Sequence, residues 1–329
     1  VIAKNDKQIK KTLWTENAEG EKISILRCSD EKDEAYRISK QIKKEISSKK
    51  LSLNDVSILY RINSQSRALE EALRREKIPY KIIGGVEFYK RKEIKDIIGY
   101  LRVLANQNDE ESLLRIMNFP QRGIGNTSIS KMIAFSRKLD LSLFTTMSRV
   151  FEVIEVKERI QKNVKQFKQL LDKYSELKDQ LSLTELVGAL IDELGILKMY
   201  KEENSAESKQ RYENVQELLS GIAEFASSNP KATIDDFLSE VSLIAGIDQY
   251  DETNNYVTLM TIHSAKGLEF PLVFITGCEE DIFPLNPKFD SDSHIEEERR
   301  LFYVAITRAE LKVILTYARS RYRFGEVAY

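Results

Sequence analysis

The polar loop within TIHSAKGLEFPLVFITG, residues 261–277, carries side chains whose types and spacing could do chemistry. It contains one lysine, Lys266, and one glycine, Gly267, between two apolar, strand-like runs. A phosphate loop needs Gly-Lys-Ser/Thr, because its backbone amides wrap around phosphate and its hydroxyl holds magnesium. No Gly-Lys dipeptide occurs in this sequence. We therefore do not expect this chain alone to hold ATP in that manner.

Two interpretations of this loop stay open. In the first, it is a short connection in which Gly267 supplies an unusual backbone angle. In the second, it lies at the carboxyl end of a parallel strand, where α/β sheets bind ligands. Glu269 could then accept hydrogen bonds from a ribose hydroxyl. Thr261 and His263 could contact phosphates on another side of the same loop.

The segment 295–317 predicts a helix followed by a strand, with Arg308 between them. Acidic residues open the helix, as the helix dipole prefers, and an apolar stripe runs along it. Arg308 could be a helix-terminal arginine that bonds the last carbonyl groups. It could also be an arginine finger that reaches a γ-phosphate held by another domain. Such fingers raise hydrolysis rates by roughly a thousandfold or more.

Polar residues also end the strand-like run at 56–61. Asn63, Gln65 and Arg67 follow that run at the start of a predicted helix, for which Ser66 is a plausible N-cap. Helix capping with a surface ion pair is the simplest interpretation of these residues.

A turn between two predicted helices carries two closely spaced glycines, Gly123 and Gly125, in RGIG. Arg122 precedes them and Thr127 follows. The turn could be a tight helix–turn–helix connection. It could also be a cradle of backbone amides for a DNA phosphate, with Arg122 nearby.

The tail RSRYRFG, residues 319–325, alternates basic and aromatic side chains. If it is extended, its three arginines share one face, and Tyr322 and Phe324 share the other. Such interleaving suits single-stranded nucleic acid, at about 1–3 kcal/mol per stacked base. An ordinary solvated edge hairpin is an equally open interpretation.

The elements that must position these residues fall into three parts. Short β-branched runs alternate with helical patterns near the amino terminus, and strand-like runs return near the carboxyl terminus, which predicts a parallel α/β sheet. The intervening stretch has apolar residues at three- and four-residue intervals and no convincing strand. We predict one α/β domain, residues 1–88 and 255–329, interrupted by an all-helical inserted domain, residues 89–254. Two separate three-stranded domains are the alternative.

Composition excludes several classes of protein. Two cysteines among 329 residues are too few for a disulfide scaffold, so the cytoplasm is the default location. Two histidines leave little for a zinc site, and we predict no metal site. No apolar run approaches the roughly 18 residues of a membrane span. The balance of 51 basic and 52 acidic residues neither predicts nor excludes a nucleic-acid partner, which needs only a local basic surface.

Together and in this order, these motifs closely resemble the UvrD/PcrA/Rep-type DNA helicases of superfamily 1A. The resemblance extends from Trp14 to past Tyr317. The matching stretches are LWTEN, YRINSQSRALEEAL, GGVEFYKRKEIKD, the RGIG turn, the YEN of RYENVQEL, VTLMTIHSAKGLEFPLVFITGCEEDIFP and EEERRLFYVAITRAELKVILTYA. The last two are long and specific.

This resemblance implies a fold and partners. The family has two RecA-like motor domains, each with an inserted domain, and this chain matches only the second motor domain and its insertion. The implied fold is a RecA-like parallel sheet of the P-loop NTPase type without the phosphate loop. ATP and Mg²⁺ would be bound mainly by the amino-terminal motor domains of the same protein, and no cofactor is expected in this chain alone. Val1 in place of methionine also leads us to expect a piece of a longer chain.

The resemblance also implies roles by position. Arg308 would sense the γ-phosphate, Glu269 would contact the ribose, and Gly267 would shape their loop.

The remaining implied roles concern DNA, on which the family moves 3′ to 5′ in repair or replication. Thr261, His263, Arg67 and Asn63 would face single-stranded DNA. The RGIG turn would grip duplex DNA, and Phe324 lies where the family carries an aromatic pin at the duplex junction. A non-catalytic module that binds DNA or docks a partner is the alternative function.

Overall fold

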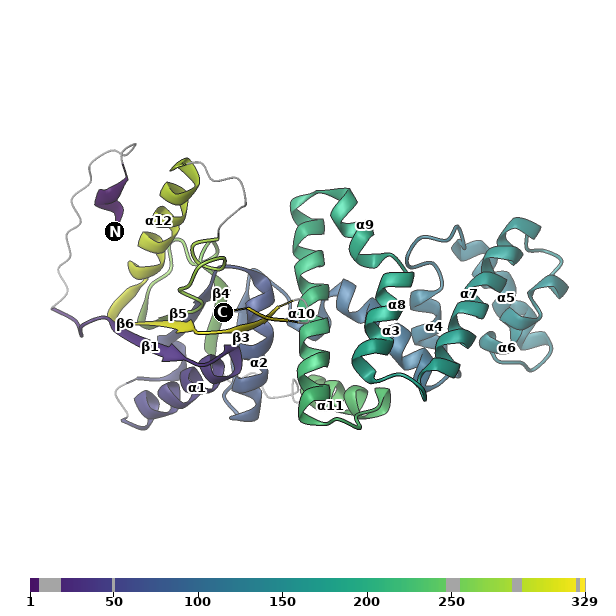
Figure 1. The fold of residues 1–329 in the computed structure, drawn as a ribbon, viewed down its shortest axis with the longest axis horizontal. Coiled ribbons are helices and arrows are strands. Elements are labelled where there is room, and N and C mark those ends of the chain that lie inside the picture. Colours follow the sequence, from purple (N-terminus) through teal and green to yellow (C-terminus); the bar gives the residue numbers. More distant parts are fainter. Residues whose placement is uncertain (6–18, 49–50, 247–254, 286–291, 324–325, 329) are drawn as a thin grey trace. The chain divides into compact units, whose positions relative to one another are not determined.

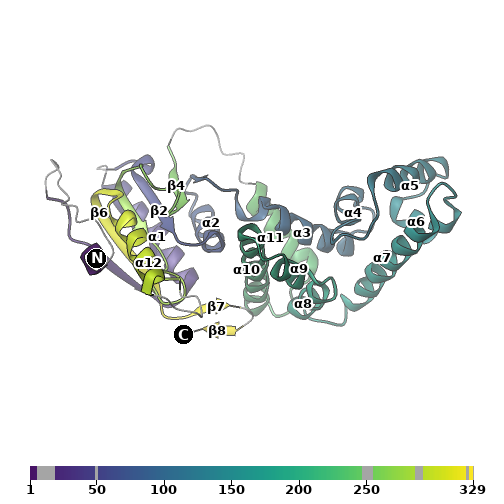
Figure 2. The ribbon, with the colours of Figure 1, turned by 90° about the horizontal axis from the view of Figure 1, so that it is seen from above.

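The computed structural model describes residues 1–5, 19–48, 51–246, 255–285, 292–323 and 326–328. The chain divides into two compact units (Figures 1 and 2). Unit 1 comprises Val1–Phe88 together with Gly246–Tyr329, and unit 2 comprises Tyr89–Ala245.

Unit 1 is built on one six-stranded sheet in the order β1-β6-β5-β2-β4-β3. Every neighbouring pair in this sheet is parallel, which confirms the predicted α/β class. The strands are β1 (Ser24–Cys28), β2 (Val56–Tyr60), β3 (Tyr80–Ile83), β4 (Val257–Thr261), β5 (Phe270–Ile275) and β6 (Ala309–Ala318). Because β2 lies between β4 and β5, strands from both ends of the chain interleave, and the alternative of two three-stranded domains is wrong.

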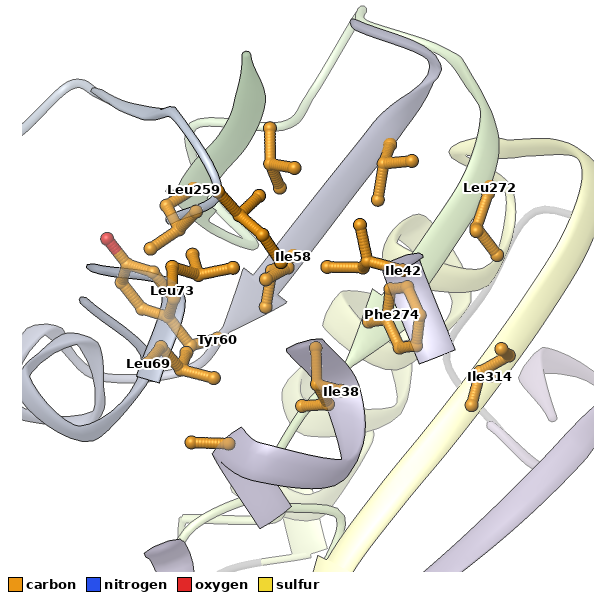
Figure 3. Close-up of a cluster of buried hydrophobic side chains, with 14 residues drawn as sticks. Ile38, Ile42, Ile58, Tyr60, Leu69, Leu73, Leu259, Leu272, Phe274 and Ile314 are labelled. Carbon is orange, nitrogen blue, oxygen red and sulfur yellow. The ribbon is translucent and has the colours of Figure 1, made fainter. Parts of the chain in front are cut away.

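Helices cover both faces of this sheet and form two cores. On one face, α1 (Glu31–Ser47) and α2 (Ser66–Arg75) contribute apolar residues to a cluster with Ile58, Tyr60 and Phe274 (Figure 3). On the other face, α12 (Asp292–Ile306) packs Leu301 and Ala305 against a second cluster. A parallel sheet buried on both faces needs continuous apolar strands, and β2 is buried at all five positions.

Local signals explain where two of these helices begin. The Asp30 side chain caps α1 by accepting a 2.8 Å hydrogen bond from the Asp33 amide. The prediction of Ser66 as the N-cap of α2 is wrong, since Gln65 occupies that position and Ser66 is the first helical residue. A 3-10 turn, Asn63–Gln65, leads directly into the helix and leaves no gap for a capping serine.

Unit 2 is helical throughout its described residues, as the sequence pattern predicts. Its helices are α3 (Lys92–Ala105), α4 (Glu110–Ile116), α5 (Asn126–Lys138), α6 (Leu143–Ser148), α7 (Glu158–Leu177), α8 (Leu183–Glu193), α9 (Ile196–Glu203), α10 (Ala206–Ser228) and α11 (Ile234–Gly246). A buried polar chain joins α3 to α10: Arg91 donates to Asn214 at 2.8 Å, and Asn214 donates to Glu93 at 2.6 Å. The asparagine of the YEN motif therefore has a structural role inside this unit.

Candidate functional site: two opposite edges of one sheet

The candidate residues of unit 1 lie at two opposite edges of the sheet. Because all six strands are parallel, their carboxyl ends meet at one edge, where Thr261 ends β4. At the opposite edge, Phe270 and Ala309 begin β5 and β6 and pair with one another. Glu269 and Arg308, each one residue earlier, therefore lie at the amino edge. The interpretation that places the whole loop at the carboxyl end is wrong for its second half.

The loop 262–269 spans the height of the sheet. In the register of the sheet, Thr261 of β4 pairs with Tyr60 of β2. Leu59, one residue before Tyr60, pairs with Ile275 of β5. Thr261 is thus about six residues above Phe270, or about 20 Å at the rise of a parallel strand. One short loop therefore connects the carboxyl edge directly to the amino edge.

Arg308 forms hydrogen bonds within its own unit that leave some of its N–H donors unused. Its Nε donates to the Val304 carbonyl at 3.1 Å, Nη1 to the Leu268 carbonyl at 2.9 Å, and Nη2 to the Thr307 hydroxyl at 3.1 Å. The interpretation as a helix-terminal arginine thus describes part of its chemistry. A guanidinium has five N–H donors, so two are not used by these bonds. The side chain is 16% exposed.

Glu269 stands next to this guanidinium. The closest approach, Arg308 Nη1 to Glu269 Oε1, is 4.0 Å, and the Glu269 side chain is 61% exposed. Gly267 has a φ of +88°, a backbone region that glycine adopts without strain. No heavy atom lies within 4 Å of a Cβ built at Gly267, so the backbone angle and not crowding requires glycine there. The amino edge therefore offers an exposed carboxylate beside an ordered arginine.

At the carboxyl edge, Thr261 organises the start of the same loop. Its hydroxyl lies 2.9 Å from the Ser264 hydroxyl and 3.3 Å from the Ser264 amide. His263 is exposed. Burial of part of the ring and the positive charge of Arg61 lower the pKa of His263, while Glu298 and Glu297 act in the opposite direction. A ring that stays neutral near pH 7 can donate one hydrogen bond without adding charge.

We expect the ring of His263 to titrate below the ordinary histidine pKa of about 6.5, because partial burial disfavours its protonated form and Arg61 repels it. A lowered folded-state pKa means that the unfolded chain binds the proton first. Stability is therefore lost as pH falls from about 6.5 towards the folded-state pKa. Nuclear magnetic resonance titration of the His263 ring protons measures this pKa directly. Arg61→Gln should raise the pKa of His263, and an unchanged midpoint would remove Arg61 as the cause.

Arg61 itself is a residue that sequence reasoning did not single out. Its guanidinium pairs with both carboxylate oxygens of Glu298, the shortest distance being 2.8 Å from Nη2 to Oε1. The two side chains are 16% and 3% exposed. The pair ties the carboxyl end of β2 to α12, the helix that ends beside Arg308. An arginine directly after an apolar strand, with EEER in a distant helix, was the available signal.

The structure positions Asn63 and Arg67 differently. Asn63 begins the 3-10 turn that follows β2 after Arg61 and Ile62, and it is partly exposed. Arg67 is 3% exposed, and its Nη1 lies 3.1 Å from Glu71 Oε2. This burial does not fit the expected contact with single-stranded DNA, since DNA would have to draw the guanidinium out of an ion pair. The ion-pair part of the simpler interpretation describes Arg67 better, although the arginine is buried and not at the surface.

Arg122 in unit 2 is also engaged internally. It donates to the Phe119 carbonyl at 2.7 Å and to the Tyr100 hydroxyl at 2.5 Å, and its guanidinium lies 4.3 Å from the centre of the Phe167 ring. Burial raises the pKa of Tyr100 to about 12, with Arg122 opposing the shift. The expected direct contact of this guanidinium with DNA therefore fits less well than a role in shaping the turn.

The turn itself exposes backbone. Gly123 has a φ of +73°, and Gly125 is the N-cap of α5. Gly123, Gly125 and Thr127 are exposed, and the first turn of α5 has no acidic residue. Among the described residues, the amides of Asn126 and Thr127 have no acceptor. The turn and helix start form the kind of amide cradle that binds phosphate.

The tail forms a short antiparallel hairpin of β7 (Arg321–Arg323) and β8 (Glu326–Ala328). Arg321 points into its own unit, where Nη2 lies 2.5 Å from Glu34 and Nε contacts Glu279. Arg321 is therefore not available to nucleic acid. Phe324 lies outside the described residues.

In the described part of the chain, no group of three or more His, Cys, Asp or Glu side chains is arranged to hold a metal ion. None of the described helices has both the length and the apolar character needed to cross a bilayer.

Comparisons with known proteins identify the family of this chain. The pattern of the family described as UvrD-like helicase C-terminal domain matches residues 1–320. ATP-dependent DNA helicase PcrA of Bacillus subtilis (strain 168) is 41% identical over 99% of this chain, and that of Staphylococcus epidermidis is 42% identical over 99%. This chain spans 45% of the length of each relative. The chain belongs to the UvrD-like helicase C-terminal domain family.

Proposed function

We propose that this chain is the carboxyl-terminal half of an ATP-dependent DNA helicase that moves 3′ to 5′ on single-stranded DNA and unwinds duplex. The observation that carries the proposal is the division of candidate residues between two edges of one sheet, joined by the loop 262–269. The direction of movement, a cytoplasmic location and a role in repair or replication follow the family resemblance. The phosphate loop and the magnesium ligands would belong to an amino-terminal half.

At the amino edge, Arg308 and Glu269 would complete the nucleotide site of that other half. The Val304 and Leu268 carbonyls hold the guanidinium in place, so its two remaining N–H donors would be oriented before substrate arrives. Preoriented charge is the main means by which such sites stabilise phosphoryl transfer. Glu269, which is exposed, would accept hydrogen bonds from ribose hydroxyls.

Two rigid connections would link this site to DNA at the carboxyl edge. One is the loop 262–269, which begins beside His263 and ends at Glu269. The other is α12, in which Glu298 forms the ion pair with Arg61. This helix ends at Ile306, about 12 Å from Glu298 along the helix axis. Loss of the γ-phosphate would release Arg308, and both connections would transmit the resulting shift to the DNA contacts.

In unit 2, the RGIG turn would bind a phosphate of duplex DNA through the amides of Asn126 and Thr127. Gly125 permits a direct test, because its φ of −80° suits any residue and no heavy atom lies within 4 Å of an added Cβ. We expect Gly125→Ala to keep the fold and to weaken duplex binding at least severalfold, since the methyl group narrows the approach to the amides. Fluorescence anisotropy with a labelled duplex measures the affinity.

A matched control for this variant is Gly188→Ala on α8, where an added Cβ also meets no heavy atom within 4 Å. That variant should bind duplex like the unchanged chain. If the unchanged chain, Gly125→Ala and Gly188→Ala bind duplex with equal affinity, the RGIG turn has only a structural role.

The main test of the proposal is reconstitution. The chain alone should show no ATPase activity, and joining it to an amino-terminal half with a phosphate loop should give DNA-stimulated hydrolysis. The competing function, a non-catalytic module that binds DNA or docks a partner, predicts DNA binding without any such restoration. Failure of the joined protein to hydrolyse ATP would favour that second function.

A further inference from the structure

The exposed face of α7 carries five donor side chains in one row. Arg159, Lys162, Gln166, Gln169 and Lys173 are all exposed. Their spacing of three and four residues places them along one side of the helix. Each side chain ends in N–H donors. The exposed carboxylates on the same side of the helix are at its two ends, Glu158 and Glu176. We refer to these five residues as the α7 donor row.

The α7 donor row lies next to the RGIG turn. Asn163, one residue after Lys162, donates from Nδ2 to the Arg122 carbonyl at 2.8 Å. Gln166 lines a pocket of about 260 Å³ together with Arg122, Asn163, Phe167 and Leu170. Both views of the ribbon show α7 beside α5 and α6 (Figures 1 and 2). The row therefore borders the surface that carries the exposed amides of α5.

The ion pairs in this row are weak and open to exchange. Lys162 pairs with Glu158 at 2.7 Å, but the two side chains are 63% and 74% exposed. Lys173 pairs with Glu193 at 2.6 Å, with 52% and 38% exposure. Exposed pairs of this kind add little to the stability of the fold. Within the described residues, the Arg159 side chain has no hydrogen bond or ion pair. A phosphate could therefore replace these partners at little cost.

We propose that the α7 donor row is a second contact with duplex DNA, which extends the grip of the RGIG turn along one phosphate backbone. The proposal rests on the proposed function. Arg159 and Lys173 are separated by fourteen residues, or about 21 Å of helix, which is long enough to reach several successive phosphates of one strand. A row of exposed N–H donors can bind phosphate oxygens but has no arrangement that reads base edges. The contact of the α7 donor row with DNA is therefore independent of the DNA sequence.

The test is the salt dependence of duplex binding by the 329-residue chain. The triple variant Arg159→Ala/Lys162→Ala/Lys173→Ala should bind a labelled 30-base-pair duplex at least about tenfold more weakly at low salt. The slope of log affinity against log salt should fall by roughly two to three, since each lost phosphate contact removes about one. Because all three side chains are exposed, circular dichroism should show an unchanged fold.

The matched control removes three other exposed lysines of unit 2 in Lys198→Ala/Lys201→Ala/Lys209→Ala, which gives the same change in charge. If control and triple variant have equal salt slopes, the α7 donor row is not a DNA contact. A loss that depends on the duplex sequence would also overturn the proposal. A further outcome is that Gly125→Ala binds duplex more weakly than the unchanged chain while the triple variant binds as the unchanged chain does. In that case the α7 donor row is not a DNA contact, and the proposed duplex contact of the RGIG turn still stands. If the unchanged chain does not bind duplex, the proposed duplex contact of the RGIG turn fails with it.

Discussion

Replacing Arg308 with alanine should lower ATP hydrolysis by roughly a thousandfold or more in a protein that joins this chain to its phosphate-loop half. The expected loss is large because the removed charge would stabilise the transition state much more than the bound substrate. The turnover number at saturating ATP and DNA is the measurement. The Michaelis constant should change far less than the turnover number.

Arg308 also holds two carbonyls, so its removal affects structure as well as chemistry. Thr307→Val separates these effects, because it removes the 3.1 Å contact to Nη2 and keeps the guanidinium. We expect Thr307→Val to retain most of the turnover. Arg308→Lys keeps the charge but loses the forked geometry, and it should stay strongly impaired. A joined Arg308→Ala protein with normal turnover would contradict the finger assignment.

Replacing Arg321 with alanine should cost about 3–5 kcal/mol of unfolding free energy, the typical loss when one partner leaves a buried ion pair. Arg321 is 12% exposed and bridges two carboxylates, Glu34 at 4% and Glu279 at 17% exposure. Glu34 also accepts hydrogen bonds from the Gly277 amide at 3.0 Å and the Thr316 hydroxyl at 2.5 Å. Chemical denaturation followed by circular dichroism measures the loss.

A matched control is Arg300→Ala, since Arg300 also bridges two glutamates, Glu296 and Glu297. Its side chain is 40% exposed and Glu297 is 56% exposed, so the expected loss is within about 1 kcal/mol. Equal losses for both variants would mean that the arrangement around Arg321 stabilises unit 1 no more than a surface pair does.

The sheet and its helices were predictable from sequence because their signals are local. The five residues of β2 are all apolar or small and are all buried, and α1 repeats Ala35, Ile38 and Ile42 on one face. The helical pattern of unit 2 was likewise predictable from apolar spacing. Whether a segment forms a strand or a helix could therefore be predicted from patterns that span a few residues.

The site was less predictable because its geometry depends on distant partners. The loop 262–269 reads as one small motif, yet its ends lie at opposite edges, which only the register of β2 with β4 and β5 determines. The sequence alone suggests that Arg122 contacts DNA, but in the fold its guanidinium bonds to Tyr100 and packs on the ring of Phe167. Arg67 looks exposed in sequence, but tertiary packing buries it. The DNA-binding roles of Arg122 and Arg67 stay predictions.

The interleaved strand order has a consequence for biosynthesis. None of the three strands encoded before residue 88 pairs with another of them: β1 pairs with β6, β2 with β4 and β5, and β3 with β4. On the ribosome, these early strands have no hydrogen-bonding neighbour until Val257 and later residues emerge. The helical unit emerges whole in the meantime and folds through local contacts, which form quickly. The nascent chain therefore carries unpaired strand edges while the whole of unit 2 is synthesised, and exposed edges of this kind favour aggregation.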